Sequence, residues 1–248
     1  MKKFFITGVS SGLGLELCRQ LLARGDSVYG VSRKEPPPQE YSGEGSGGEL
    51  IWQPCDVTIF EDIHRIIEHQ RSIGFCPDVV ILNSGAHHND TDDFVYEDYE
   101  SLFKVNCAGA LGWVEAYLPG FKNRGSGQFV YISSLAARFP FPFRGAYSAS
   151  KAYTSLTFKY LQKQFARFGV GFTVIYAGLL DTQMSSRVKI PEFFKYPVSR
   201  AAEVVLRAVE SGADCKSFPL RAVLLEWVLT LFPNSILIRL LEARLQKS

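Results

Sequence analysis

Short hydrophobic runs alternate along this chain with longer stretches whose hydrophobic positions recur at helical spacing. The first unit comprises a run at residues 4–7, a helical pattern at 13–24 and a second run at 27–31, with glycines at the junctions. Such alternation is typical of parallel strands joined by crossover helices. The N-terminal part of the chain is therefore predicted to form a βαβ unit.

The same alternation continues over most of the chain. Further strands are predicted at residues 50–53, 79–83, 128–133 and 171–176, and further helices at 60–72, 96–121, 149–168, 200–211 and 220–245. Because crossovers between parallel strands are right-handed, these elements predict an α/β fold with one doubly wound, mostly parallel sheet and helices on both faces. No repeat or composition shift marks a second domain, so we expect residues 1–248 to form a single domain with an apolar helical extension at about 220–245.

Charge and composition narrow the class of protein. The 248 residues include 27 Lys and Arg against 25 Asp and Glu, which is a formal net charge of +2. This balance lacks the basic excess of a nucleic-acid-binding protein, so no nucleic-acid partner is expected. With 46% hydrophobic and 21% charged residues, the chain is also too apolar for intrinsic disorder.

Cysteine usage and the apolar stretches favour a cytoplasmic protein. The cysteines form no Cys-x-x-Cys pair and no cluster with histidine at metal-ligand spacing, so we expect neither a disulfide framework nor a metal site. The apolar N-terminal run is too short for a secretory signal, and the run at 223–232 contains Glu226 and is stopped by Pro233. The five cysteines are Cys18, Cys55, Cys76, Cys107 and Cys215.

A glycine-rich segment joins the first predicted strand to the first helix. Gly8, Gly12 and Gly14 follow Thr7 in the spacing Gly-x-x-x-Gly-x-Gly. Glycines let a pyrophosphate approach the backbone, and a helix N-terminus presents free N–H groups and a partial positive charge. On its own, the segment is compatible with nucleotide binding and with a plain strand-to-helix turn.

Four further motifs decide between these interpretations. They are Asp56-Val57, Asn83-Ser84-Gly85-Ala86, Tyr147 and Lys151 with Ser134 upstream and Asn106 in the preceding helix, and Gly178 to Thr182. In this order and spacing, and with the glycine loop, they resemble the classical short-chain dehydrogenase/reductase family over roughly residues 3–210. The chain departs from the family pattern in the segment after Asn83 and at Ala177, where proline is usual. The resemblance implies a Rossmann fold and a dinucleotide cofactor.

Tyr147 and Lys151 are four residues apart, so on a helix both side chains project from one face. A nearby ammonium lowers the pKa of a phenol toward the range of a general acid/base. The resemblance implies that Tyr147 exchanges a proton with the substrate oxygen while Ser134 orients that oxygen. It also implies that Lys151 lowers the Tyr147 pKa and holds the nicotinamide ribose, and that Asn106 anchors a water. Ser133 competes with Ser134, but its spacing to Tyr147 fits less well.

The end of the second predicted strand indicates which cofactor binds. No acidic residue stands there to accept bonds from a ribose 2′-hydroxyl, whereas Ser32 and Arg33 offer donors to a 2′-phosphate, so NADP(H) is expected. The expected cofactor contacts are Thr7, Gly8, Ser10, Ser11, Gly12, Leu13, Gly14, Ser32, Arg33, Asp56, Val57, Asn83, Ser84, Gly85, Tyr147, Lys151, Gly178 and Thr182.

These expectations describe an NADP(H)-dependent oxidoreductase that interconverts a ketone or aldehyde, apolar or aromatic, and its alcohol. A dinucleotide-binding regulator with little turnover and an NAD-linked alcohol dehydrogenase are the alternatives. The aromatic stretch at 138–144 and the apolar segment at 183–198 lie at the substrate side by resemblance, although the phenylalanines fit packing between loops or subunits equally well. The family commonly forms homodimers or homotetramers through the helices that contain Asn106 and Tyr147.

Three segments stay open. The Pro- and Gly-rich residues 36–48 are expected to form a surface loop. His87 and His88 fit a solvent-facing loop or a substrate contact better than a metal site, because adjacent side chains on an extended chain point in opposite directions. The C-terminal helix is amphipathic and is expected to pack within the molecule or against a subunit, with a membrane surface as the remaining option.

Overall fold

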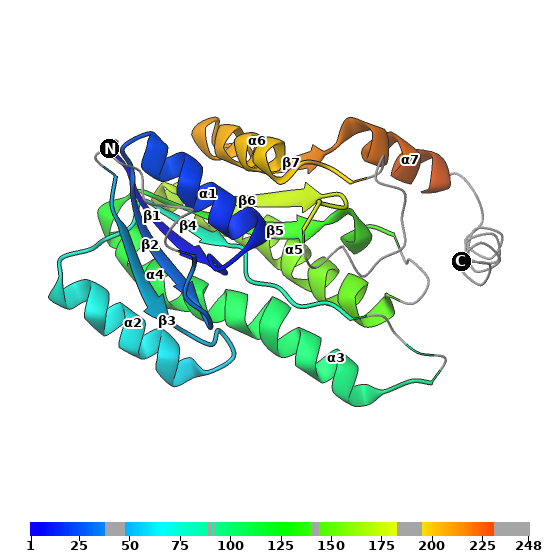
Figure 1. Cartoon of the computed structure of the whole chain (residues 1–248), viewed down its shortest axis with the longest axis horizontal. Helices are drawn as coiled ribbons and strands as arrows, with labels where there is room; N and C mark the ends of the chain where they lie inside the picture. Colours follow the sequence, from blue (N-terminus) through cyan, green and yellow to red (C-terminus); the bar gives the residue numbers. More distant parts are fainter. Residues whose placement is uncertain (38–47, 89–90, 92, 140–143, 183–194, 231–248) are drawn as a thin grey trace.

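Seven parallel strands form one sheet in the computed structural model, which describes residues 1–37, 48–88, 91, 93–139, 144–182 and 195–230. The order across the sheet is β3-β2-β1-β4-β5-β6-β7 (Figure 1). This order confirms the predicted α/β class and the doubly wound parallel arrangement. The strands are β1 (Lys3–Thr7), β2 (Ser27–Ser32), β3 (Leu50–Pro54), β4 (Val79–Leu82), β5 (Gly127–Ser134), β6 (Val170–Ala177) and β7 (Cys215–Phe218).

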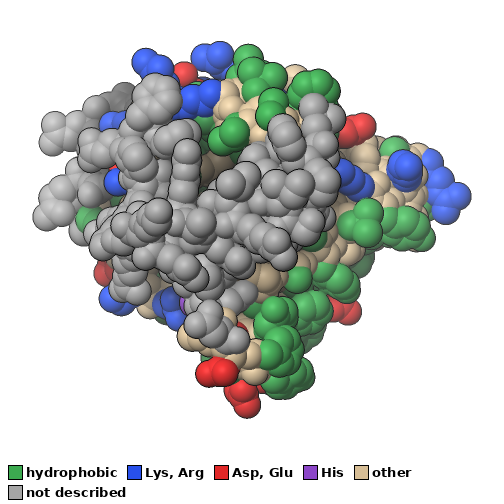
Figure 2. All heavy atoms as spheres, turned by 90° about the vertical axis from the view of Figure 1, so that its right-hand side faces the viewer, with side chains coloured by type: hydrophobic (Ala, Val, Ile, Leu, Met, Phe, Trp, Pro, Cys, Tyr) green, Lys and Arg blue, Asp and Glu red, His purple; other side chains and the backbone are tan. Residues whose placement is uncertain are grey.

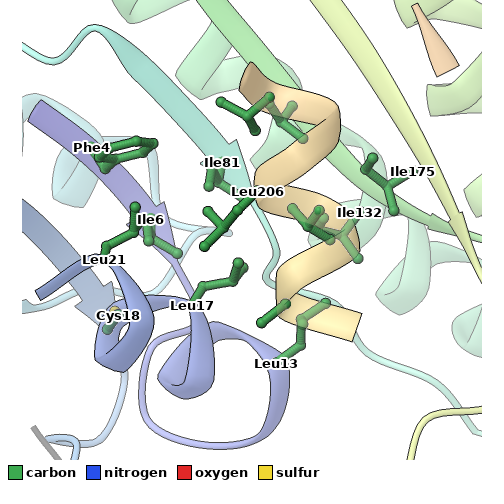
Figure 3. Packing of buried hydrophobic residues seen from close by; sticks show 14 of the residues in the cluster. Phe4, Ile6, Leu13, Leu17, Cys18, Leu21, Ile81, Ile132, Ile175 and Leu206 are labelled. Carbon is green, nitrogen blue, oxygen red and sulfur yellow. The ribbon is translucent and has the colours of Figure 1, made fainter. Parts of the chain in front are cut away.

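Helices cover both faces of the sheet. In Figure 1, α1 (Gly12–Ala23) and α6 (Val198–Glu210) lie above it, and α2 (Phe60–Ser72), α4 (Gly109–Arg124) and α5 (Gly145–Phe165) lie below it. Strand side chains alternate between the two faces, so Phe4 and Ile6 pack under α1 and α6 (Figure 3), whereas Phe5 packs against Trp113 of α4 with ring centroids 4.5 Å apart. Both faces of the sheet are therefore buried, as in a doubly wound fold.

Two elements differ from the sequence prediction. The helix expected at 96–121 is divided into α3 (Tyr96–Phe103), a π-helical turn η2 (Lys104–Ala108) and α4. β7 was not predicted because its sequence, Cys-Lys-Ser-Phe, lacks a hydrophobic run. It forms the edge of the sheet, where Cys215 and Lys216 are exposed.

The structure describes only the first part of the predicted C-terminal helix. α7 (Leu220–Thr230) follows β7 directly, and residues 231–245 of the prediction lie outside the described residues, as do residues 38–47 of the Pro- and Gly-rich loop. Two short 3-10 turns, η3 (Leu135–Ala137) and η4 (Ala166–Phe168), complete the elements. Among the helices of the described ranges, none is both long and apolar enough to span a bilayer.

Candidate active site

The glycine loop forms a backbone cradle at the carboxyl end of β1. Gly8 and Gly12 have φ of 76° and 57°, a region that disfavours side chains. At Gly14, a Cβ would overlap the Gly8 carbonyl oxygen. Ser11, the N-cap of α1, makes no side-chain capping bond, so its hydroxyl does not occupy the first N–H groups of the helix. A cradle of this shape at a helix N-terminus fits the phosphates of a dinucleotide.

Hydrogen bonds of the Asn83 and Thr7 side chains stabilise this cradle. The Asn83 Nδ2 donates to the carbonyl oxygens of Thr7 and Gly8, both at 3.1 Å. The Thr7 hydroxyl accepts bonds from the backbone N–H groups of Asn83 and Ser84, at 3.0 and 2.9 Å. Four bonds thus tie the end of β1 to the end of β4, and they assign Asn83 and Thr7 to supporting the loop.

The loops after β2 and β3 lie beside the cradle in the sheet order. The Ser32 hydroxyl is buried, donates to the Lys34 carbonyl oxygen at 2.6 Å and accepts from Trp52 Nε1 at 3.0 Å. Arg33 is exposed. Asp56 Oδ1 accepts two bonds from Thr58, which closes the turn before α2. Of Ser32 and Arg33, the two predicted contacts at the end of β2, Arg33 is therefore the one whose side chain is accessible to a ligand.

The segment after β6 reaches the other side of the cradle. A Cβ on Gly12 would lie 3.2 Å from Thr182 Cγ2, so Thr182 lies close to the glycine loop. Gly178 instead serves the fold, because its N–H donates to the Phe218 carbonyl at 2.7 Å and its Cβ position is 2.8 Å from Pro219 Cδ. Leu13 is likewise buried in the core under α6, which leaves only its backbone for a ligand.

Asn106 lies in the π-helical turn and clamps two loops together. Its Oδ1 accepts from Ala86 N, and its Nδ2 donates to Ala86 O and to Ser150 Oγ, all at 3.0 Å. Its backbone carbonyl accepts from Tyr131 and Thr154, both at 3.1 Å. The side chain is fully buried, so in this structure Asn106 acts as a clamp between the loop after β4 and α5.

The end of β5 separates the two candidate serines. Ser133 is buried and its Oγ lies 2.7 Å from Ser155 Oγ. Ser134 points the other way, accepts from Ala136 N at 3.2 Å and lies near enough to Tyr147 to lower the pKa of its phenol. The geometry therefore brings Ser134 and not Ser133 to Tyr147.

Burial sets the acidity of Tyr147. Removal of the phenol from water raises its pKa, and the nearby Ser134 hydroxyl and Arg144 guanidinium oppose that rise. The cation that lowers the pKa is thus Arg144, whereas the sequence led us to expect Lys151. The phenol keeps its proton at neutral pH and is available as a donor.

Burial also changes the acidity of Lys151. Its side chain is buried, and burial lowers the pKa of its ammonium to about 8, so it remains mostly protonated at pH 7 and loses its charge above pH 8. Its Nζ donates to the Ile132 carbonyl at 2.9 Å and lies 4.8 Å from the centroid of the Tyr131 ring. A Cβ on Gly85 would lie 3.2 Å from this Nζ, so a glycine leaves room for the lysine.

Two residues near Tyr147 were not assigned to the site from the sequence. Arg144 stands three positions before Tyr147 at the start of α5. Residues at this spacing on a helix are neighbours, so the spacing could have indicated from the sequence that Arg144 lies near Tyr147. His87 lies edge-on to the Tyr147 ring, with centroids 6.1 Å apart and planes at 88°, which brings one of the two open histidines to the site. The expected substrate segments at 140–143 and 183–194 lie outside the described residues.

No group of three or more His, Cys, Asp or Glu side chains in the described ranges is arranged to hold a metal ion. His88 lies 3.4 Å from the Asp98 carboxylate instead. The groups that the described residues bring together beside the backbone cradle are the Ser134 hydroxyl, the Tyr147 phenol and the Lys151 ammonium.

Comparison with known proteins identifies relatives of this architecture. The family model described as short chain dehydrogenase matches residues 2–192. A fatty acyl-CoA reductase of Acinetobacter baylyi is 30% identical over 84% of this chain and 72% of its own length, and a ketoacyl reductase of a Nostoc species is 27% identical over 85% and 76%. The crystal structure of a short chain dehydrogenase from Burkholderia cenocepacia in complex with NADP superposes with a TM-score of 0.80 at 27% identity, covering 97% of both chains.

The buried ammonium predicts a pH-dependent stability difference. Replacing Lys151 by Met removes a charge that burial disfavours, and we expect it to raise the free energy of unfolding by about 1–3 kcal/mol at pH 7. The native pKa of about 8 lies below the ordinary 10.5, so the unfolded chain binds more protons between these values. The wild type should therefore gain stability relative to the variant as the pH rises from 8 to 10.5.

Urea unfolding at a series of pH values measures this difference. The matched control is Lys163→Met, which removes an exposed lysine from the same helix and should give a small difference without this pH dependence. A Lys151→Met difference that is constant with pH would contradict the lowered pKa of the Lys151 ammonium.

Proposed function

The chain belongs to the short-chain dehydrogenase family, and on that premise we propose that it is an NADP(H)-dependent oxidoreductase that interconverts a ketone or aldehyde and its alcohol. The observation that carries the proposal is the placement of Ser134 beside Tyr147, with the buried Lys151 one helical turn further along α5. A binding protein without turnover has no physical need for this pair.

The proposed reaction divides the work among a few groups. When bound, the nicotinamide cofactor supplies the hydride for reduction. Tyr147 donates a proton to the substrate oxygen, and the Ser134 hydroxyl holds the same oxygen by a hydrogen bond. Because burial raises the Tyr147 pKa, the phenol is protonated before reduction, and the Arg144 charge stabilises the phenolate that forms.

Lys151 has a separate part in this proposal. Its Nζ lies beside the Gly85 Cα, next to the loop that lines the cofactor side of the site. From there it is placed to hold the nicotinamide ribose. Asn106 positions this loop through Ala86, so that we propose it as a positioning residue for the cofactor pocket.

NADP(H) is the proposed cofactor. Arg33 is the exposed cation at the end of β2, and the loop beside it contains no carboxylate at the strand tip that would select a 2′-hydroxyl. The Burkholderia cenocepacia structure at 27% identity is in complex with NADP, which supports the same choice here.

The proposed substrate is an apolar carbonyl compound. The names of the Nostoc and Acinetobacter relatives, a ketoacyl reductase and a fatty acyl-CoA reductase, both describe carbonyl groups on acyl chains. His87, against the Tyr147 ring, is placed to contact such a substrate next to the reacting carbonyl.

Turnover should depend on the Tyr147 phenol. We expect Tyr147→Phe to lower kcat by at least about 10³-fold with little change in NADPH affinity, because the ring remains and only the proton donor is lost. We measure kcat from the absorbance decrease as NADPH is oxidised in the presence of acyl and aromatic carbonyl compounds. Fluorescence titration measures the affinity for NADPH.

The serines provide a matched pair for the same assay. Ser134→Ala should lower kcat by about 10²-fold, whereas Ser133→Ala, which removes the hydroxyl bonded to Ser155, should leave kcat within about threefold. Tight NADPH binding without turnover of any compound in the wild type would instead support the regulator.

Cofactor choice should depend on Arg33. We expect Arg33→Asp to weaken NADPH binding about 10–100-fold through loss of a charge-assisted bond to the 2′-phosphate, with NADH affinity nearly unchanged. Lys34→Asp is the control, since it makes the same charge change on the next exposed side chain. Fluorescence titrations with both cofactors test this, and an equal loss for NADPH and NADH would refute the role of Arg33.

We further propose that a second copy of the chain covers the exposed aromatic face of α3 and α5. Phe103 and Tyr153 pack together with ring centroids 5.3 Å apart, although Phe103 is 44% exposed and Tyr153 is 48% exposed. Leu156 and Tyr160, one and two turns along α5, are 71% and 62% exposed. Such a contiguous apolar patch is typical of a subunit interface.

A charge on this face should disrupt the assembly. We expect Leu156→Glu to shift the protein toward monomer, because an unpaired carboxylate would be buried at the interface. Sedimentation velocity measures the change, and Ile73→Glu, an exposed position at the end of α2, is the control. A wild type that sediments as a monomer at all concentrations would rule out this interface.

A further inference from the structure

α7 begins at the edge of the sheet where the candidate active site lies. β7 ends at Phe218, whose carbonyl accepts from Gly178 at the end of β6, and Pro219 packs against the same glycine. In the strand register, Ala177 is opposite Ser134 on β5. The first turn of α7 is therefore at the carboxyl ends of the strands, on the side that faces the viewer in Figure 2.

The polarity of α7 is inverted relative to a helix that faces water. Its acidic residue, Glu226, is only 7% exposed, and Ala222 and Val223 pack against the buried core. The side chains that point outward are hydrophobic. They are Leu220, Leu224, Leu225, Trp227 and Val228, which are 72%, 54%, 48%, 62% and 43% exposed.

Specific contacts hold α7 in this orientation. The Arg138 guanidinium lies 3.7 Å from the Glu226 carboxylate, donates to Ser217 Oγ at 2.8 Å and stacks on the Tyr176 ring at 3.7 Å. Burial raises the pKa of Glu226, and Arg138 opposes that rise. A helix rotated by half a turn would hydrate the carboxylate and bury the leucines, so the contacts with Arg138 select the orientation that exposes them.

We propose that this outward face of α7 docks on a lipid membrane surface that contains anionic headgroups. Figure 2 shows hydrophobic side chains along the upper edge of the face, where Figure 1 places α7. The exposed residues of α7 include Arg221 and no carboxylate among those whose burial the structure describes. Leucines with an exposed tryptophan and basic neighbours are the composition of a helix that lies in the membrane interface.

The sequence after α7 has the same chemistry. Residues 231–248 are rich in leucine and isoleucine and carry Arg239, Arg244 and Lys247 against Glu242. This positive balance complements anionic headgroups. A second copy docked through the same face of α7 would instead bring Arg221 toward its own counterpart, so the charge favours lipid as the occupant.

Docking through α7 would turn the mouth of the site toward the membrane. Both lie at the carboxyl ends of the strands. Arg138 links the site to α7, because it comes four residues after Ser134, at the end of η3, and its guanidinium lies beside Glu226 of α7. An apolar substrate dissolved in the lipid would then enter the site without crossing water. This consequence concerns access and leaves the chemistry of the proposed reaction unchanged.

Flotation with vesicles tests the proposal on the full chain. The wild type should float with phosphatidylcholine–phosphatidylglycerol vesicles, and its tryptophan emission should shift to the blue as Trp227 enters the lipid. The variant Leu224→Ser/Leu225→Ser/Val228→Ser keeps Trp227 and changes only exposed residues, so it should fold and bind NADPH as the wild type does. We expect its vesicle–water partition coefficient to fall at least about tenfold.

The control replaces a similar exposed apolar area elsewhere. Ile59→Ser/Phe60→Ser/Ile73→Ser changes three side chains that flank or begin α2, each between 46% and 49% exposed, and should float like the wild type. A wild type that stays in the soluble fraction, or an α7 variant that floats equally well, overturns the proposal. A change in sedimentation coefficient of the α7 variant without vesicle binding by the wild type would show a second copy as the occupant. NADPH binding is measured separately, so failure here is distinguishable from failure of the proposed function.

Discussion

Parallel pairing makes every strand of this sheet end at the same edge, and the candidate site is a consequence of that constraint. The glycine loop, Asn83, Ser134 and Thr182 follow four different strands that are far apart in the sequence. Hydrogen bonds between these ends, such as those of Asn83 with Thr7 and Gly8, turn separate loops into one cradle. The helices on both faces exclude water from the sheet, so polar groups concentrate where the strands stop.

Within the site, burial decides the charge of each group. Burial disfavours the Lys151 ammonium, although the Ile132 carbonyl and the Tyr131 ring beside it stabilise its charge, while Tyr147 loses contact with water and keeps its proton. At neutral pH the phenol is therefore uncharged, whereas most of the Lys151 side chains keep their charge. A cofactor that brings negative phosphates and closes the site would change the charge balance of both, so the proton affinities relevant to turnover belong to the complex.

The sequence was sufficient to predict the fold class and the relative orientation of side chains whose spacing matches the period of a helix or a strand. Tyr147 and Lys151 share a helix face as their spacing requires, and alternation along β5 separates Ser133 from Ser134. Sequence could not predict the π-helical turn at Asn106, because that turn is stabilised by tertiary bonds to Ala86 and Ser150. The same holds for β7, whose pairing with β6 compensates for a sequence without a hydrophobic run, and for the cation that acts on Tyr147.

Arg138 has a consequence for how this protein can change during evolution. It contacts Tyr176, Ser217 and Glu226, which belong to β6, β7 and α7. Loss of Glu226 alone leaves the arginine without its carboxylate, and loss of Arg138 alone leaves a buried carboxylate without a counter-charge. The two positions are therefore epistatic, and a lineage that discards the pair passes through a less stable intermediate unless both residues change together.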